Sequence, residues 1–342
     1  MRPEVLEAFG SDVISHRGPE MAALIQEILP GVRSLFETRE AILLSSSSAS
    51  GLMEGSIRNC VGRRCLHLVS GAFGERWRQV AADCGRDPEA LQVEPGDPFT
   101  PEAVEKALSS GAYEAVCLTH NETATGVTHP LSAIARVVRR HENVLLMVDA
   151  VSSLGGIPVS MDANGIDVCF ASVQKAMALP PGYSVCAVSS RALARAREMQ
   201  GRGYYFDFAR LAEASEKGQP LATPSVSHLM ALRVQLRIML QEGLEKRYAR
   251  HAAMAERVRA WARERFGVLA KRGFESNTVT CVTNPRGIRV AEFIQKLKGR
   301  GYQISNGYGN LKEATFRIGH MGEHTLEGIE GLLKTMDEVL EA

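Results

Sequence analysis

The chain has 342 residues, of which 45% are hydrophobic and 23% are charged, and its formal net charge is +1. This composition is typical of a folded globular protein with a large apolar core, and the length favours two domains over one. Because neither basic nor acidic residues are in excess, we expect no binding to nucleic acid or to a membrane surface.

The seven cysteines are scattered along the chain without a Cys-x-x-Cys pair, and several lie inside apolar runs. This pattern favours buried free thiols over disulfides, and it offers no metal-ligand spacing. No apolar run approaches the length of a membrane span, and the first residues do not resemble a signal peptide. We therefore expect a cytoplasmic protein that binds no metal.

Through the first two thirds of the chain, short apolar runs alternate with amphipathic helical patterns. Helices are predicted to begin near residues 51, 74, 130 and 191. Strands that alternate with helices of this length predict an α/β fold with a mostly parallel sheet covered by helices on both faces. The predicted strands comprise residues 41–45, 64–70, 114–120, 144–151, 167–172 and 183–190.

The last third has a different pattern. Residues 228–265 form a long, helical, arginine-rich stretch, followed by two strand-like runs and two further helical segments. This order predicts a smaller α+β domain hinged on the long helix. We expect an N-terminal helix at 1–12, a large domain at 13–235 and a small C-terminal domain at 236–342.

Lys175 lies in the turn after an apolar strand, within the stretch FASVQKAMALPPGY. A lysine in a partly desolvated pocket has a lowered pKa and can act as a nucleophilic amine that forms a Schiff base. The alternative interpretation is a surface lysine at a strand-to-loop turn.

Asp149 stands at the end of another apolar run, where strands of open α/β sheets present their ligand-binding edge. A poorly hydrated carboxylate at this edge needs a cationic partner, and the protonated ring nitrogen of a pyridine cofactor would serve. The alternative is a carboxylate that caps the following helix.

Small residues follow the first strand, where Ala49, Ser50 and Gly51 begin a helix. Their backbone N–H groups, with the Ser50 hydroxyl, would bind a phosphate monoester, or they form an ordinary N-cap. Phe73, between glycines at another strand end, would stack on a flat cofactor or belong to the core. Residues 118–127, LTHNETATGV, offer hydroxyl groups for a phenolate oxygen or form a polar turn.

Arg317 lies in a strand-like run with apolar neighbours, near His320. A guanidinium binds a substrate carboxylate through two hydrogen bonds, although Arg317 would alternatively pair with a nearby glutamate. His320 is expected to be structural. Together, a phosphate site, a stacking ring, a buried carboxylate, a lysine and a late arginine are what pyridoxal 5′-phosphate (PLP) and an amino acid require.

The chain resembles the class V aminotransferases, and most closely their alanine/serine–glyoxylate branch, over nearly its whole length. The resemblance implies a PLP enzyme of fold-type I, with a mostly parallel seven-stranded sheet between helices and a smaller C-terminal α+β domain. It also implies a homodimer with active sites at the subunit interface. It is carried by seven motifs in the family order: HRGPEM, SGAFGERW, THNETATGV, VDAVSSLGGIPVSMDANGID, SVQKAMALPPGY, TPSVS and FRIGHMG.

The resemblance implies roles for individual residues. Lys175 matches the lysine that forms the Schiff base and shuttles a proton, and Asp149 matches the partner of the pyridinium nitrogen. Arg317 matches the arginine that binds the substrate carboxylate. The implied cofactor contacts are Ala49, Ser50 and Gly51 at the phosphate, Phe73 and Val151 on the two ring faces, Gln174 and Thr123 near cofactor oxygens, and Thr223 at the phosphate of the other subunit.

The expected activity is a ping-pong transamination from alanine or serine to a 2-oxo acid, with glyoxylate as the expected acceptor. The alternatives are a 2-aminoethylphosphonate transaminase, a PLP lyase or desulfurase, and a PLP-binding relative with weakened activity. A desulfurase would need a cysteine in a mobile loop, whereas Cys281 lies in a strand-like run. Family members usually carry a longer N-terminal arm, so we expect a truncated arm at 1–12 to affect substrate affinity and dimer stability.

Overall fold

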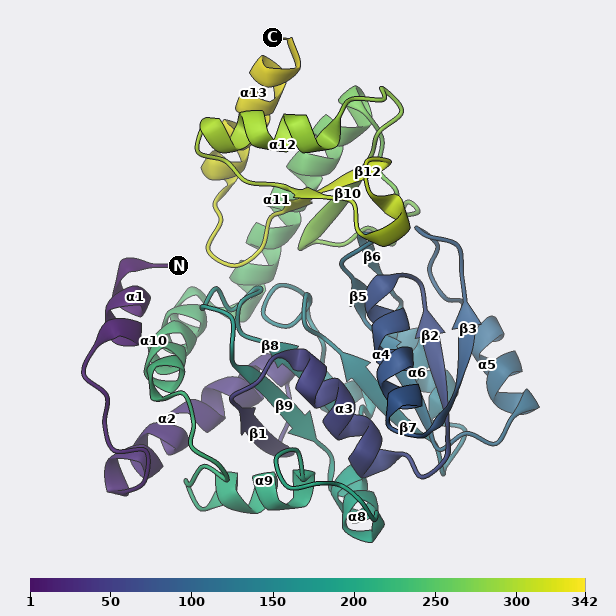
Figure 1. Cartoon of the computed structure of the whole chain (residues 1–342), viewed down its shortest axis with the longest axis vertical. Coiled ribbons are helices and arrows are strands. Elements are labelled where there is room, and N and C mark those ends of the chain that lie inside the picture. The colour runs from purple at the N-terminus through teal and green to yellow at the C-terminus, as the bar shows by residue number, and fades with distance from the viewer. Residues whose placement is uncertain (342) are drawn as a thin grey trace.

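The computed structural model describes residues 1–341, which form a large lower part and a small upper part in Figure 1. A seven-stranded sheet crosses the large part in the order β1-β9-β8-β7-β4-β2-β3. Only β9 runs antiparallel to its neighbours in this sheet. Its strands are β1 (Ala41–Ser45), β2 (Arg64–Val69), β3 (Asp87–Gln92), β4 (Ala115–Thr119), β7 (Leu145–Asp149), β8 (Val168–Ser172) and β9 (Ser184–Val188).

Both faces of this sheet are buried, because successive side chains of a strand point to opposite faces. In β7, Leu146 and Val148 pack into one apolar core, while Leu145 and Met147 pack into another. The first core is covered by α2 (Pro19–Phe36), α5 (Pro101–Ser110), α6 (Leu131–Val138), α7 (Met161–Asn164) and α10 (Val226–Glu242). The second is covered by α3 (Ala49–Cys60), α4 (Ala72–Asp83), α8 (Ser190–Glu198) and α9 (Phe208–Glu216).

The small part has a third core between a three-stranded antiparallel sheet and three helices. The strand order is β10-β12-β11, so β12 lies in the centre. The elements are β10 (Val279–Thr283), β11 (Ser305–Asn306), β12 (Thr315–Gly319), α11 (Leu244–Arg265), α12 (Val290–Gly299) and α13 (Leu326–Glu341), with a short 3₁₀ turn at Gly309–Leu311. A two-stranded hairpin of β5 (Asn121–Glu122) and β6 (Val127–Thr128) belongs to the large part and lies next to the small part (Figure 1).

The predicted long helix between residues 228 and 265 is divided. Gly243 ends α10 with φ +83, a backbone conformation that favours glycine, and α11 begins at Leu244. The expected boundary at residue 235 lies inside α10. The division lets α10 pack on the large part while α11 enters the small one (Figure 1).

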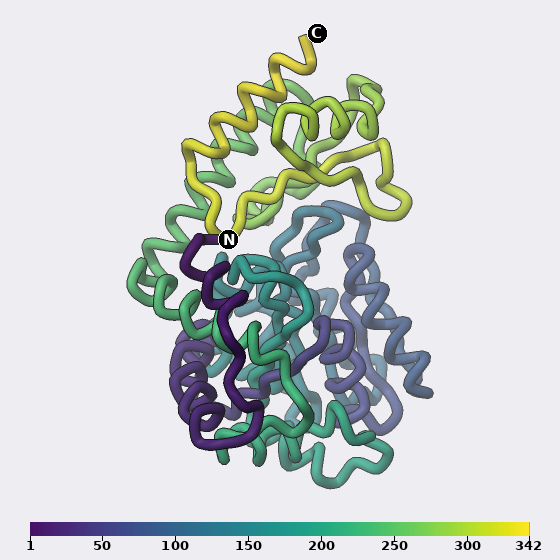
Figure 2. The backbone as a smooth tube through the Cα atoms, turned by 60° about the vertical axis from the view of Figure 1, so that its left-hand side comes forward, coloured from purple at the N-terminus to yellow at the C-terminus, as the bar shows by residue number. Residues whose placement is uncertain are grey.

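The first helix, α1 (Pro3–Gly10), packs along α10. Figure 2 shows the N-terminus at the level where the two parts meet, next to the start of α13. The side chain of Arg2 crosses this boundary, since its Nε lies 2.5 Å from a carboxylate oxygen of Glu323.

The predicted α/β architecture is therefore confirmed, although the sequence did not reveal β3. All seven cysteines are free, and each is buried except Cys84, which is half-buried. Within residues 1–341, no helix has both the length and the apolar character needed to span a bilayer.

Candidate active site

A cavity of about 170 Å³ opens at the carboxyl ends of β4, β7 and β8, beside the first turns of α3 and α4. Because parallel strands end at the same edge, residues far apart in sequence meet there. Most of the predicted site residues line this cavity, namely Ala49, Ser50, Phe73, Thr123, Asp149, Val151, Gln174 and Lys175.

Lys175 follows β8 and lies between two hollows. It lines the cavity together with Gln174, and the same two residues line an open cleft that reaches Arg2 and Glu323. Burial lowers the pKa of the Lys175 amine, the positive charge of Arg317 lowers it further, and Asp149 opposes the shift. No carboxylate of the described chain lies within ion-pair distance of the amine, which therefore loses its proton more readily than an exposed lysine.

Asp149 ends β7 and is 3% exposed. One carboxylate oxygen accepts the N–H of Val151 at 2.8 Å, and no basic side chain of residues 1–341 forms an ion pair with it. Burial raises its pKa to about 7. Because the Val151 bond closes a local turn, the carboxylate does not cap a helix, and a buried carboxylate without a cationic partner is available for one.

The start of α3 offers fewer free N–H groups than the sequence suggested. The Ala49 N–H donates to Ser172 Oγ and the Gly51 N–H donates to Ser48 O, each at 3.0 Å. Gly51 instead accommodates Phe206, since a Cβ at position 51 would lie 2.4 Å from that ring. Of the three predicted amides, that of Ser50 alone has no acceptor among the described residues.

Phe73 is held at the cavity wall by a buried carboxylate. Glu122 accepts the N–H groups of Phe73 and Gly74 at 3.0 and 3.1 Å, which fixes the first turn of α4. Tyr308 from the small part packs on Phe73, with ring centroids 5.5 Å apart, and its hydroxyl accepts a hydrogen bond from Arg76 at 2.6 Å. The aromatic wall thus combines residues from both parts of the chain.

Two buried polar atoms in the cavity wall have no partner within residues 1–341. They are Oε1 of Gln174 and Oγ1 of Thr119. Thr123 differs from them, because its hydroxyl donates to Ser152 Oγ at 2.9 Å. Since buried polar atoms are normally hydrogen-bonded, the two free oxygens indicate a place for a polar ligand.

Arg317 comes from β12 and approaches the cavity from the small part. Its guanidinium donates to the carbonyl of Asn306 at 3.1 Å and to that of Thr123 at 3.4 Å. It forms no ion pair with any described carboxylate, so the alternative of a glutamate partner is wrong. Burial lowers the pKa of Arg317, which leaves a partly desolvated cation near Lys175.

Two residues from the sequence analysis lie elsewhere. Thr223 lines a separate cavity with Tyr183 and Tyr205 and does not approach Lys175 of its own chain. His320 is buried, and its ring hydrogen-bonds to Thr280 Oγ1 at 2.9 Å, as expected of a structural histidine.

The sequence analysis did not identify Glu122, Arg76 or Ser172 as parts of this site. Glu122 lies inside the quoted stretch LTHNETATGV, and its carboxylate so close to a strand end was a usable signal. The contacts of Ser172 with Ala49 and of Arg76 with Tyr308 join positions far apart in the chain, so no local pattern reveals them.

Comparisons with known proteins agree with this geometry. The family model described as aminotransferase class-V matches residues 16–321. An uncharacterized aminotransferase of Methanocaldococcus jannaschii is 35% identical, covering 94% of this chain and 85% of the relative. Alanine–glyoxylate aminotransferase of Oryctolagus cuniculus is 32% identical over 99% and 90% of the two chains. The crystal structure of an alanine–glyoxylate aminotransferase from Nostoc sp. superposes with a TM-score of 0.95 at 28% identity, covering 99% and 92%.

Proposed function

Because the chain belongs to the class V aminotransferases, which are PLP-dependent enzymes, we propose that it transfers the amino group of alanine or serine to glyoxylate. The observation that carries this proposal is that one site contains both a half-buried lysine and an arginine that forms no ion pair with a described carboxylate. Lys175 supplies an amine of lowered pKa, and Arg317 supplies a binding group for one substrate carboxylate.

The residues around the cavity suit PLP. Asp149 has no cationic partner of its own, so its carboxylate would pair with the protonated ring nitrogen. Phe73 and Val151 would hold the two faces of the ring, and the Ser50 amide and hydroxyl would bind the phosphate. The free oxygen of Gln174 would contact the cofactor beside Lys175.

PLP, when bound, supplies a carbonyl carbon for the amine and a ring that stores the electron pair released from the substrate. The protein controls the protons of this chemistry. The lowered pKa leaves a larger fraction of Lys175 unprotonated near neutral pH. Its amine can therefore take a proton from the substrate Cα and give it back to a neighbouring atom. Since Phe73, Tyr308 and Arg317 close around the cavity from both parts, they would also exclude water.

The arginines favour a substrate with a single acidic group. Arg76 also lines the cavity, but it is engaged with the hydroxyl of Tyr308 and lies over the ring of Phe73. Arg317 bonds only to backbone carbonyls within residues 1–341. One guanidinium without an ion pair fits alanine, serine or glyoxylate, and the alanine–glyoxylate activity of the Oryctolagus cuniculus relative supports alanine and glyoxylate.

The alternatives make different demands on the site. A desulfurase would need a mobile nucleophilic thiol, whereas Cys281 is buried in β10 and burial raises its pKa to about 11. A 2-aminoethylphosphonate donor has no carboxylate for Arg317 to bind. A PLP-binding protein without turnover would still use Lys175 to hold the cofactor, but it would have no need of an arginine such as Arg317 for a substrate carboxylate.

We also propose that the active unit is a homodimer. Thr223 does not face Lys175 of its own subunit, and it lines a separate cavity beside Tyr205. In a dimer this threonine would contact the phosphate in the partner's site. Light scattering would measure the mass in solution, and Thr223→Val should weaken PLP binding without changing the mass; a fully active monomer would contradict the proposal.

The decisive experiment is a panel of donors and acceptors. The protein loaded with PLP is mixed with alanine, serine or 2-aminoethylphosphonate, each with glyoxylate or pyruvate, and the amino products are measured. We expect alanine or serine with glyoxylate to give the highest kcat/KM. Preference for aminoethylphosphonate would replace the proposed donor, and binding of PLP without any turnover would favour the non-enzymatic alternative.

A further inference from the structure

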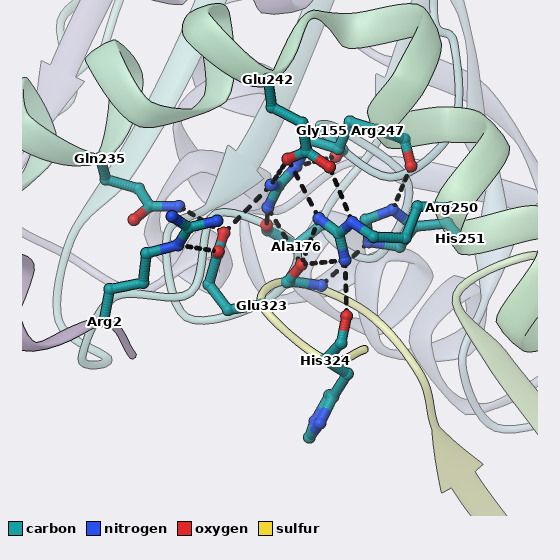
Figure 3. A network of polar contacts seen from close by, with 11 residues as sticks. Arg2, Gly155, Ala176, Gln235, Glu242, Arg247, Arg250, His251, Glu323 and His324 are labelled. Carbon is teal, nitrogen blue, oxygen red and sulfur yellow. Dashed lines mark hydrogen bonds and ion pairs between the residues drawn. The ribbon is translucent and has the colours of Figure 1, made fainter. Parts of the chain in front are cut away.

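A cluster of charged side chains around one buried arginine lies where the two parts of the chain meet, outside the cavity (Figure 3). At its centre is Arg247 in the first turns of α11, whose side chain is 0% exposed. Two carboxylates, Glu242 and Glu323, lie at 2.7 and 3.0 Å from its Nη1 atom. Burying a guanidinium costs free energy of desolvation, which its hydrogen bonds and ion pairs must offset. The groups that make these contacts are therefore held close to Arg247.

All three guanidinium nitrogens of Arg247 donate hydrogen bonds. The Nε atom donates to the carbonyl of Gly155 at 3.0 Å, and Nη2 donates to those of Ala176 at 2.7 Å and Gly322 at 3.2 Å. Nη1 donates to Glu242 at 2.7 Å and forms an ion pair with Glu323. The three nitrogens of the planar group reach acceptors in different directions, which the single nitrogen of a lysine could not do.

The three carbonyls belong to the three segments that carry the proposed catalytic groups. Gly155 lies in the turn that follows Asp149, Ala176 directly follows Lys175, and Gly322 follows the strand that contains Arg317. One planar group therefore joins segments that are far apart in sequence, and it fixes their distances from one another.

Neighbouring residues reinforce the contact with the small part. The N–H of Gly322 donates to Nε2 of His251 at 3.0 Å, and Nδ1 of the same ring donates to the carbonyl of Arg247 at 2.7 Å. Burial lowers the pKa of His251 to about 4, so the neutral ring makes both bonds. A Cβ at position 322 would lie 3.2 Å from Ala178 and 3.4 Å from the carbonyl of Lys175, so the Gly322 backbone lies directly on the lysine turn.

We propose that Arg247 is a positioning residue, which holds the Lys175 turn at a fixed place relative to Asp149 and Arg317. It contacts the backbone beside these residues and none of their side chains. The role as catalytic support rests on the function proposed above, whereas the effect on the backbone does not.

The same helix provides a matched control. Arg250 also contacts Glu242 and donates to the carbonyls of Gly322 and His324, but it makes no hydrogen bond to Ala176 or Gly155. Arg250→Met therefore removes a neighbouring arginine and leaves the lysine turn held. In Arg247→Met, Glu242 keeps Arg250 and Glu323 keeps Arg2 and Gln235, so neither carboxylate loses all of its partners.

Hydrogen exchange measures the position of the turn without any catalysis. The amides of Ala178 and Leu179 donate to the carbonyls of Lys175 and Val173 at 2.9 and 3.1 Å. In the full-length protein, with and without PLP, we expect Arg247→Met to speed exchange in the peptide that contains these amides by about tenfold or more. Arg250→Met should leave the exchange of this peptide within twofold of the unaltered chain.

Kinetics then test the catalytic consequence. We expect Arg247→Met to lower kcat about 10²-fold with the best donor, because a displacement of about 1 Å can have this effect, and to shift the pH profile of kcat. Arg247→Lys should recover part of kcat, and Arg250→Met should leave the pH profile unchanged. If Arg247→Met does not fold, Arg247→Lys is compared with Arg250→Lys in the same two measurements.

The possible results distinguish the two proposals. Equal exchange of the Lys175 turn in the paired Arg247 and Arg250 variants would overturn the positioning role, even if the enzyme transaminates as proposed. Faster exchange in the Arg247 variant alone would support the positioning role, even if the donor panel refuted the proposed substrates.

Discussion

The cavity and the junction of the two parts both contain buried charge, and they treat it in opposite ways. In the cavity, the buried Asp149 lacks a cationic partner and Oε1 of Gln174 lacks any partner among the described residues, while the half-buried Arg317 beside it lacks a carboxylate. At the junction, every guanidinium nitrogen of Arg247 donates a hydrogen bond, and two carboxylates balance its charge. Unpaired buried groups cost free energy, so their concentration in one cavity marks a binding site, whereas a fully paired group determines a fixed arrangement.

The largest expected effect comes from removing the amine in the unpaired region. Lys175→Ala should lower kcat by at least about 10³-fold and abolish the visible absorption band of the bound cofactor, because no other described amine lines the cavity. Lys271→Ala, whose side chain is 63% exposed, is the control and should match the unaltered chain in both measurements. Retained turnover in Lys175→Ala would refute the proposed mechanism.

The unpaired arginine should matter through substrate binding. Arg317→Gln is expected to lower kcat/KM for carboxylate-bearing donors about 10²-fold, mostly through KM, because the guanidinium is partly desolvated and has no internal carboxylate. Steady-state kinetics with alanine and serine measure this loss. Arg263, which pairs with Glu275, offers a contrast, and Arg263→Gln should change kcat/KM less than twofold. Equal effects of the two variants would contradict the distinction between free and paired arginines.

The unpaired carboxylate should make the cofactor-free protein sensitive to pH. The folded state raises the pKa of Asp149 from 3.8 to about 7, so it binds this proton more tightly than the unfolded state does. The contribution of Asp149 to stability therefore falls as pH rises from about 4 to 7, by up to about 4 kcal/mol, and is constant above that range.

Denaturant unfolding at pH 5 and pH 8 measures this effect. The side chain in Asp149→Asn does not ionise. The free energy of unfolding of the variant minus that of the unaltered chain should therefore increase with pH. Added PLP should reduce the difference by supplying the missing cation. A difference that does not depend on pH would mean that the Asp149 carboxylate is already paired.

The smallest effect is expected from a buried thiol outside both regions. Cys281→Ala should leave kcat within twofold and lower stability by about 1 kcal/mol, because the side chain is packed in β10. Turnover assays and denaturant unfolding measure the two quantities. A loss of activity with cysteine as the substrate would instead revive the desulfurase alternative.

Much of the fold was predictable because the buried strands of the sheet are continuous apolar runs. The strand β3 escaped prediction for the opposite reason: it is an edge strand that pairs only with β2, and its sequence DPEALQ is largely polar and contains a proline. The break at Gly243 was also missed, because one glycine within an arginine-rich helical pattern gives a weak signal.

The site was predictable where strand ends carried unusual residues. Asp149 and Lys175 each follow an apolar run, and both line the cavity. The prediction that the N–H groups of Ala49 and Gly51 are free was wrong. They donate to Ser172 and Ser48, and these contacts depend on how the helix end packs. Arg247 could not be recognised at all, since its acceptors at positions 155, 176 and 322 are joined only in three dimensions.

The composition of the Arg247 cluster has a consequence for the pH response of the enzyme. A guanidinium keeps its proton throughout the physiological range, and His251 is neutral above about pH 4. Burial raises the pKa of Glu323, but its contacts with Arg2, Arg247 and Gln235 outweigh burial and lower this pKa to about 2. The charge state of the Arg247 cluster is therefore constant between about pH 5 and 9. A pH–rate profile of the unaltered enzyme in this interval reports on Lys175, Asp149 and the substrate, and not on a titration of the Arg247 cluster.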